Sequence, residues 1–217
     1  WHCELRFECG AMKLVADIGG THARFALLDV AGEPAQIQNL KTADYSDLGA
    51  AMTAYLKMSQ ASAFAAVVSI AAPLADDRVR MTNASWDFSV EKTKQEVGLQ
   101  SLRLVNDFEA LALAVPTLQG HELQALGHVL PQDTQLAKAI LGPGTGLGMA
   151  GVVPVVANGQ TRWHALPCEG GHASIAPTTE REVTLLQAIW HIASEPPGLR
   201  HICWEDLLSG TGLPLLH

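Results

Sequence analysis

The sequence lacks a membrane-length apolar run and has few basic residues. Its longest apolar run, residues 61–75, is interrupted by serine and proline and falls short of the roughly 20 residues that a membrane helix needs. The 14 Lys and Arg residues are outnumbered by 22 Asp and Glu residues, which gives a net charge of −8. We therefore expect neither a membrane nor nucleic acid as the main partner, because both attract basic proteins.

Paired cysteines and the commonest nucleotide-binding signature are also missing. The four cysteines, Cys3, Cys9, Cys168 and Cys203, form no Cys-x-x-Cys pair, so neither a zinc site nor a disulfide framework is predicted. Reduced thiols in a cytoplasmic protein are the simplest interpretation. No Gly-Lys pair occurs anywhere in the chain, which excludes a Walker A loop.

What is present predicts a globular α/β protein. Hydrophobic residues make up 48% of the chain and charged residues 17%. Three strand-like segments are followed by helix and strand in alternation, an order that favours a mixed sheet covered by helices. Strands are expected at 14–18, 23–30, 36–42, 64–73 and 102–107. Helices are expected after the caps Ser46, Ser89 and Asn106, the second ending at Gly98.

The chain is expected to contain two domains with an extension before them. Residues 1–12 follow neither a strand nor a helix period and are predicted to lie outside the fold. The first domain should cover 13–116, and a polar stretch after Pro116 marks the crossing to the second, at 117–217. That second part has strand-like segments at 138–156 and 161–167 and a helix at 180–193 that begins with a Thr179–Glu182 capping box. Because it is short for a strand layer and a helix layer, we expect it to be incomplete at its C-terminal side.

Two glycine-rich turns each follow an apolar strand, DIGGT at 17–21 and GPGTGLG at 142–148. Glycine lacks a Cβ, so backbone N–H groups in such turns can approach a phosphate closely, and each turn adds a threonine hydroxyl. One such turn would more often be an ordinary hairpin. Two turns of this kind favour a phosphate site divided between them, formed by Gly19, Gly20 and Thr21 and by Gly144, Thr145 and Gly146.

Asp17 has two interpretations. Aspartate is common at strand ends, where it helps to form turns. Beside phosphates, the same carboxylate could position hydrated Mg²⁺, which keeps most of its water and usually takes only one or two carboxylates. The glycines that follow immediately favour the second interpretation.

Asn106 and Asp107 stand where a buried strand becomes a helix. Asn106 can cap this helix together with Glu109, and Asp107 would complement the helix dipole. Asp107 would also face the crevice at the carboxyl ends of the strands, where open α/β sheets bind ligands, and it could accept a proton there from a hydroxyl nucleophile. The two roles are compatible, and local sequence alone does not choose between them.

Three further residues could form a ligand site. Glu169 and His172 are separated by two glycines, so a tight turn could point both into a site. Carboxylates that accept hydroxyl hydrogen bonds would suit a sugar, and Glu205 could join them, although it could also be a solvated helix residue. The group is weak as a metal site, since the chain has no HExxH motif.

Taken together, these motifs resemble the bacterial glucokinase family of the hexokinase and actin-like ATPase superfamily. Seven blocks occur in the family's order from about position 13 to the end: ADIGGTHARFAL, AAP, MTNASW, VNDFEALA, GPGTGLGMA, EGGHASIAP and LLSGTGL. The resemblance implies a two-domain α/β fold of ribonuclease-H-like topology and transfer of the ATP γ-phosphate to the 6-hydroxyl of glucose. His22 stands where asparagine is more usual.

The resemblance also implies roles for single residues. The two glycine turns would bind ATP, with Asp17 near Mg²⁺ through water. Asp107 would be the catalytic base. Glucose contacts are implied for Asn83, Asn106, Asp107, Glu169, His172 and Glu205. A cytoplasmic enzyme of glycolysis is implied, and a homodimer is among the oligomeric states left open.

The sequence also admits other interpretations. The family's adenosine-binding segment and closing helices would lie beyond His217, so a catalytically inactive sugar-binding or regulatory relative is the main alternative. A repressor-like sugar kinase is disfavoured because its cysteine-rich zinc motif is missing. A chaperone-type ATPase of the same superfold would have no use for Glu169, His172 and Glu205.

Overall fold

The computed structural model describes residues 12–72, 74, 76–81, 84–127, 135–193, 201–210 and 212–216. It divides into two compact units, Trp1–Ala110 and Leu111–His217, and each is described by itself. This division falls inside a helix, whereas the sequence placed the crossing after Pro116. The predicted extension lies outside the described residues except for Met12, which is the first residue of a strand.

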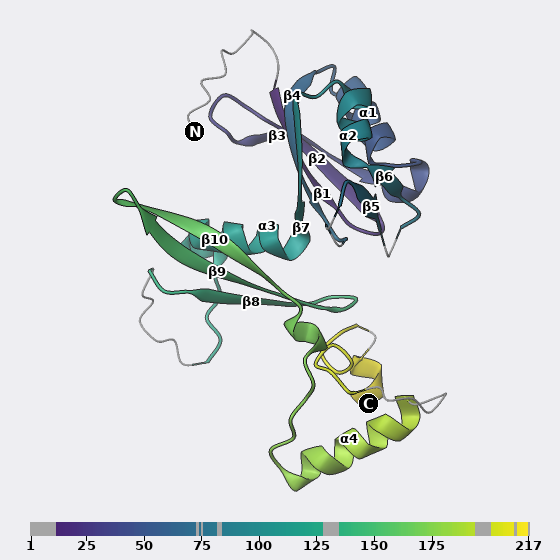
Figure 1. Cartoon of the computed structure of the whole chain (residues 1–217), viewed down its shortest axis with the longest axis vertical. Helices are drawn as coiled ribbons and strands as arrows, with labels where there is room; N and C mark the ends of the chain where they lie inside the picture. Colours follow the sequence, from purple (N-terminus) through teal and green to yellow (C-terminus); the bar gives the residue numbers. More distant parts are fainter. Residues whose placement is uncertain are drawn as a thin grey trace. The chain divides into compact units, whose positions relative to one another are not determined.

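The first unit is built on a five-stranded sheet in the order β3-β2-β1-β4-β7 (Figure 1). Strand β1 runs antiparallel to β2 and parallel to β4, and β7 is parallel to β4. The predicted mixed sheet is therefore confirmed. Its strands are β1 (Met12–Ile18), β2 (His22–Leu28), β3 (Pro34–Lys41), β4 (Ala63–Ile70) and β7 (Ser101–Asn106).

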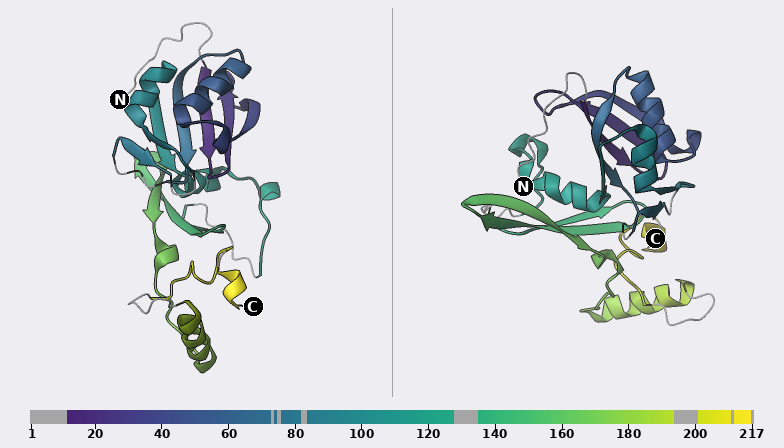
Figure 2. Two further views of the ribbon diagram at one scale, coloured as in Figure 1. Left: turned by 90° about the vertical axis from the view of Figure 1, so that its right-hand side faces the viewer. Right: turned by 45° about the horizontal axis from the view of Figure 1, so that its top comes forward.

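Helices α1 (Leu48–Met58) and α2 (Val90–Val97) pack beside each other on one face of this sheet (Figure 2). Between them in sequence lies a short hairpin of β5 (Arg78–Arg80) and β6 (Asp87–Ser89). The rings of Phe25 on β2 and Tyr55 on α1 stack against each other, with their centroids 5.2 Å apart. Burying each such side chain contributes about 1.5–3 kcal/mol, so this layer stabilises the sheet that carries the candidate residues. The largest fully buried side chains here are Trp86, Tyr55, Phe25, Leu14, Ile18, Leu27, Leu48 and Met52.

The helix caps agree with the sequence in one case and correct it in another. Ser89 caps α2 by accepting from the Lys92 N–H at 3.1 Å, and Gly98 ends that helix in the left-handed conformation, both as predicted. The predicted cap of α1 was wrong. Asp47 rather than Ser46 accepts from the Ala50 N–H, at 2.9 Å, because the helix begins one residue later than expected.

The second unit contains a three-stranded antiparallel sheet in the order β10-β9-β8 and the helix α4 (Glu180–Ala193). The predicted capping box of α4 is confirmed: Thr179 N–H donates to Glu182 at 3.2 Å, and Glu182 N–H donates to Thr179 Oγ1 at 3.2 Å. In the described part of the chain, no helix has both the length and the apolar character needed to cross a membrane. The strands are β8 (Lys138–Pro143), β9 (Leu147–Ala157) and β10 (Gln160–Cys168).

Shorter helical segments complete both units. Helix α3 (Asp107–Ala114) follows β7 directly, and Pro116 lies in the 3-10 turn η2 (Val115–Thr117) beyond its end. The remaining 3-10 turns are η1 (Thr42–Asp44), η3 (Gly120–Glu122), η4 (Gly170–His172) and η5 (Leu213–Leu216).

Replacement of Gly98 by alanine should destabilise the first unit through backbone conformation alone. The site has φ +79° and no atom within 4 Å of an added Cβ, so only the left-handed backbone opposes the change. We expect Gly98→Ala to lower the free energy of unfolding by about 1–2 kcal/mol in urea denaturation followed by circular dichroism. Gly98→Asn is the matched control, because asparagine at the same position tolerates the left-handed backbone better than alanine does. Equal unfolding midpoints for the two variants would contradict this explanation.

Candidate functional site

The first glycine turn, which joins β1 to β2, is fixed by a buried threonine. Gly19 N–H donates to the His22 carbonyl at 2.9 Å and closes the turn. Thr42 then holds its tip from η1: its N–H donates to the Thr21 carbonyl at 3.1 Å, and its hydroxyl donates to the Gly20 carbonyl at 2.7 Å. Thr42 is 2% exposed. The sequence did not single out Thr42, whose two donors satisfy the carbonyls of Gly20 and Thr21.

Trp86 supports Thr42 in turn. Its indole N–H lies 3.1 Å from the Thr42 carbonyl and 3.0 Å from the Tyr45 carbonyl, and the ring is fully buried. The block MTNASW therefore contributes to the first turn through its tryptophan. Asn83, which the sequence predicted in the same block, lies outside the described residues.

Asp17 lies on β1 between residues of the two neighbouring strands. It pairs in register with Arg24 of β2 and Ser69 of β4. Arg24 Nη1 lies 3.4 Å from Asp17 Oδ2, and Ser69 Oγ donates to Asp17 Oδ1 at 3.4 Å. Both contacts are long, and the carboxylate is 56% exposed, so it remains accessible to a hydrated cation. The place of Arg24 beside Asp17 could have been predicted from the pairing of strands in the expected hairpin. The place of Ser69 could not, because it depends on the register between the parallel strands β1 and β4.

Asn106 and Asp107 lie at the same edge of the sheet as the first glycine turn. Ile18, Ile70 and Asn106 are abreast on β1, β4 and β7, so the carboxyl ends of three parallel strands meet there. Asn106 caps α3 as predicted, accepting from Phe108 N–H at 2.9 Å and Glu109 N–H at 3.3 Å. The first unit therefore brings Asp107 together with Asp17 and the turn.

The electrostatics of Asp107 differ from those of an exposed aspartate. Burial raises the pKa of its carboxyl group, and the negative charge of Asp17 raises this pKa further. Hydrogen bonds oppose the shift, chiefly the one from the Phe108 N–H, which donates to Asp107 Oδ1 at 2.9 Å. A carboxylate with a raised pKa is a better proton acceptor than an ordinary aspartate.

The second glycine turn, residues 144–146, joins β8 to β9 and contacts the C-terminal segment. Gly144 N–H donates to the Gly146 carbonyl at 2.8 Å, and Gly210 N–H donates to the Gly144 carbonyl at 2.7 Å. At the end of the turn, Leu147 N–H donates to Glu205 Oε2 at 2.8 Å. The role of Gly210 was not predicted, although it belongs to the block LLSGTGL.

Glu169, His172 and Glu205 lie together in the second unit, as a shared site requires. His172 Nε2 is 3.7 Å from Glu169 Oε2, and His172 Nδ1 is 3.8 Å from Glu205 Oε1. Glu205 lies in a turn, not in a regular helix, and its N–H donates to the Gly171 carbonyl at 2.8 Å. The carboxylate of Glu169 is 90% exposed and that of Glu205 is 32% exposed, so Glu169 in particular offers acceptors to a ligand.

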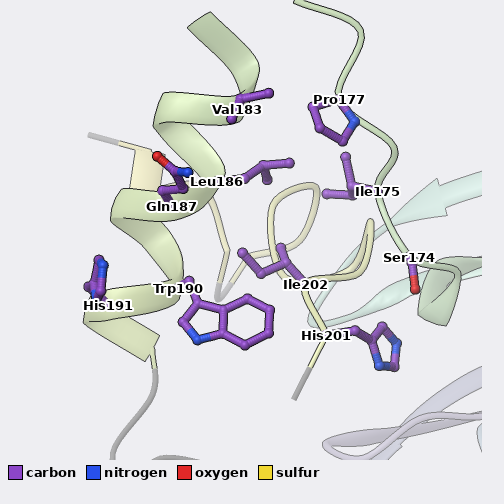
Figure 3. A pocket seen from close by; sticks show the side chains of 10 residues that line it. All are labelled: Ser174, Ile175, Pro177, Val183, Leu186, Gln187, Trp190, His191, His201 and Ile202. Atoms are coloured by element: carbon purple, nitrogen blue, oxygen red, sulfur yellow. The ribbon is translucent and has the colours of Figure 1, made fainter. Parts of the chain in front are cut away.

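An apolar cavity of about 450 Å³ lies elsewhere in the second unit, between α4 and the segments that face it (Figure 3). None of the predicted site residues lines it. Among the described residues, no group of three or more His, Cys, Asp or Glu side chains is arranged to hold a metal ion. The cavity is lined by Ser174, Ile175, Pro177, Val183, Leu186, Gln187, Trp190, His191, His201 and Ile202.

The chain is similar to glucokinases both in sequence and in structure. A family model described as glucokinase matches residues 14–217. The glucokinase of Chromobacterium violaceum is 45% identical over 207 residues, which are 94% of this chain and 56% of that protein. A crystal structure of glucokinase from an Antarctic psychrotroph has a TM-score of 0.75 at 33% identity, over 94% of this chain and 62% of that one.

A more distant structure supports the fold alone. Glucokinase from Balamuthia mandrillaris, crystallised in complex with glucose, has a TM-score of 0.69 at 21% identity, over 95% of this chain and 61% of that one. The predicted two-domain actin-like ATPase fold is thus confirmed, and the chain spans just over half the length of its curated relative.

Thr42→Val should loosen the first glycine turn. Valine keeps the shape of threonine but removes the donor to the Gly20 carbonyl, so we expect a loss of about 1–3 kcal/mol in the free energy of unfolding. Amide hydrogen exchange in residues 18–22 should also accelerate. Thr42→Ser retains the hydroxyl and is the control, expected to keep the exchange rates of the turn close to those of the wild type. Slow exchange in the valine variant would show that the hydroxyl does not hold the turn.

Proposed function

Since the chain belongs to the glucokinase family, we propose that the whole protein transfers the γ-phosphoryl group of ATP to the 6-hydroxyl of glucose. The observation that supports this proposal most is the position of Asp107. Its carboxyl group has a raised pKa and lies beside a glycine turn, at the edge of the sheet where the parallel strands end. Glucose 6-phosphate and ADP would be the products.

The two glycine turns would hold the phosphates of ATP. The Gly20 N–H and the Thr21 hydroxyl would contribute donors from the first unit, where the Gly19 N–H closes the turn on the His22 carbonyl. Residues 145 and 146 would contribute donors from the second unit, where the Gly144 N–H closes the turn on the Gly146 carbonyl. Asp17 would hold Mg²⁺ through water, which its exposed carboxylate suits. When bound, Mg²⁺ supplies positive charge that offsets the charge on the phosphates.

Asp107 would accept the proton of the attacking hydroxyl. A bond forms between glucose O6 and the γ-phosphorus, the bond from that phosphorus to the bridging oxygen of ADP breaks, and the hydroxyl proton passes to the carboxylate. Even with a raised pKa, Asp107 is a weak base toward an alcohol, so proton transfer follows the acidification of O6 as its new bond forms. Asn106 caps α3 and would hold the sugar beside Asp107.

The acceptors of the second unit would bind the other hydroxyls of glucose. Carboxylates accept hydrogen bonds from paired hydroxyls, and His172 lies between Glu169 and Glu205. We propose a sugar contact for Asn83 as well, from its place in MTNASW. A cytoplasmic location, a place in glycolysis and a homodimer belong to the same proposal.

A coupled assay for glucose 6-phosphate tests the proposed reaction. We expect product only when glucose, ATP and Mg²⁺ are all present, and titration calorimetry should detect glucose and a non-hydrolysable ATP analogue separately. Binding of glucose without binding of the nucleotide and without product would instead identify a sugar-binding regulator.

Removal of the Asp107 carboxylate should separate binding from chemistry. We expect Asp107→Ala to lower kcat by about 10²–10⁴ while the Kd for glucose changes less than about tenfold. The control Glu109→Gln removes a charge two residues away in the same helix and should leave turnover near that of the wild type. Unchanged turnover in Asp107→Ala would refute the role of base.

The pH profile gives an independent check on Asp107. The base acts when ionised, so kcat/KM should fall as pH decreases through the pKa of Asp107, which lies above the ordinary value for aspartate. The residual activity of Asp107→Asn should lack this acidic limb. An identical limb in the variant would assign it to another group.

A further inference from the structure

Glu205 contacts both the sugar-contact residues and the second glycine turn. One carboxylate oxygen, Oε2, accepts from Leu147 N–H at 2.8 Å, directly after the turn. The other, Oε1, lies 3.8 Å from His172 Nδ1. A single side chain therefore joins the sugar-contact residues to the second glycine turn, which are separate motifs in the sequence.

The contact between Glu205 and the second glycine turn depends on glycines that let neighbouring groups approach the backbone closely. A Cβ added at Gly146 would collide with Glu205 Oε2, and one added at Gly171 would collide with the Leu147 carbonyl. The Glu205 N–H also donates to the Gly171 carbonyl at 2.8 Å. Residues 144–147, 169–172 and 203–210 are thus held together, and the position of the Glu205 carboxylate depends on the presence of glycine at 146.

We propose that Glu205 is a positioning residue that couples sugar binding to the second glycine turn, an inference that rests on the proposed function. Sugar hydroxyls that donate to Oε1 restrict the carboxylate to the orientation in which Oε2 holds the Leu147 amide. The turn is then ordered before the phosphates bind. Linkage requires the converse effect, so nucleotide in the turn raises the affinity for sugar by the same factor, typically about 5- to 150-fold.

Two alanine variants in the second unit test this coupling without changing Glu205 itself. Gly146→Ala displaces the flexible end of Glu205, whereas Gly120→Ala adds its Cβ to open space outside the proposed site, and neither glycine has a left-handed φ. We expect Gly146→Ala to weaken glucose binding about tenfold in calorimetry without nucleotide, and Gly120→Ala to keep it within about twofold. Equal glucose affinities in the two variants would overturn the proposal.

Amide exchange at Leu147 provides a readout that needs no ligand. Exchange should accelerate about tenfold in Glu205→Ala and stay near the wild-type rate in Glu205→Gln, whose side-chain carbonyl can still accept the hydrogen bond. Glu169→Gln should weaken glucose binding but leave the Leu147 exchange rate unchanged, because the Glu169 carboxylate pairs with His172 while the Leu147 N–H donates to Glu205. An unchanged rate in Glu205→Ala would refute the positioning role.

The two proposals fail in different ways. If the wild type forms no glucose 6-phosphate but glucose still slows Leu147 exchange, the coupling stands and the proposed reaction does not. If glucose binds the wild type without slowing Leu147 exchange, the coupling is refuted although the enzyme is active.

Discussion

Both glycine turns depend on the same physical constraint: a flexible backbone can hold a fixed shape only if distant side chains satisfy its polar groups. Thr42 does this for the first turn from 22 residues beyond Gly20, and Glu205 does it for the second from 58 residues beyond Leu147. Glycine allows close approach but has the largest conformational freedom in the unfolded chain. The supporting side chains offset that freedom, and the remaining amides of each turn can then face a ligand.

Asp17 and Asp107 lie at the same edge of the sheet in the first unit, but their surroundings differ and suit them to different roles. The Asp17 side chain is more than half exposed and its contacts with Arg24 and Ser69 are long, so it stays available to a hydrated cation. Asp107 is partly buried at the start of α3, where desolvation and the charge of Asp17 raise its pKa. Because β1 and β7 end at the same level on either side of β4, the sheet sets both environments at once.

Much of the fold could be predicted because local patterns dictate it. Continuous apolar runs marked β1 and β4, and Ser89 with Gly98 marked both ends of α2. The cap of α1 was misplaced because Ser46 and Asp47 are adjacent acceptors and the choice depends on a shift of one residue. Thr42 and the contact of Glu205 with Leu147 had no local signal, since a single threonine or glutamate gives no sign of a partner far along the chain. The ligand roles of the site residues stay predictions, including that of Asn83.

The neighbours of Asp17 also differ in the loops that they close. Arg24 is 7 residues away along the chain, across a hairpin, whereas Ser69 is 52 residues away, across a parallel pairing. Closing a longer loop costs more chain entropy. The surroundings of this acid therefore depend on both halves of the sheet: the hairpin brings the guanidinium beside it at small entropic cost, and the hydroxyl is in place only where β4 pairs with β1.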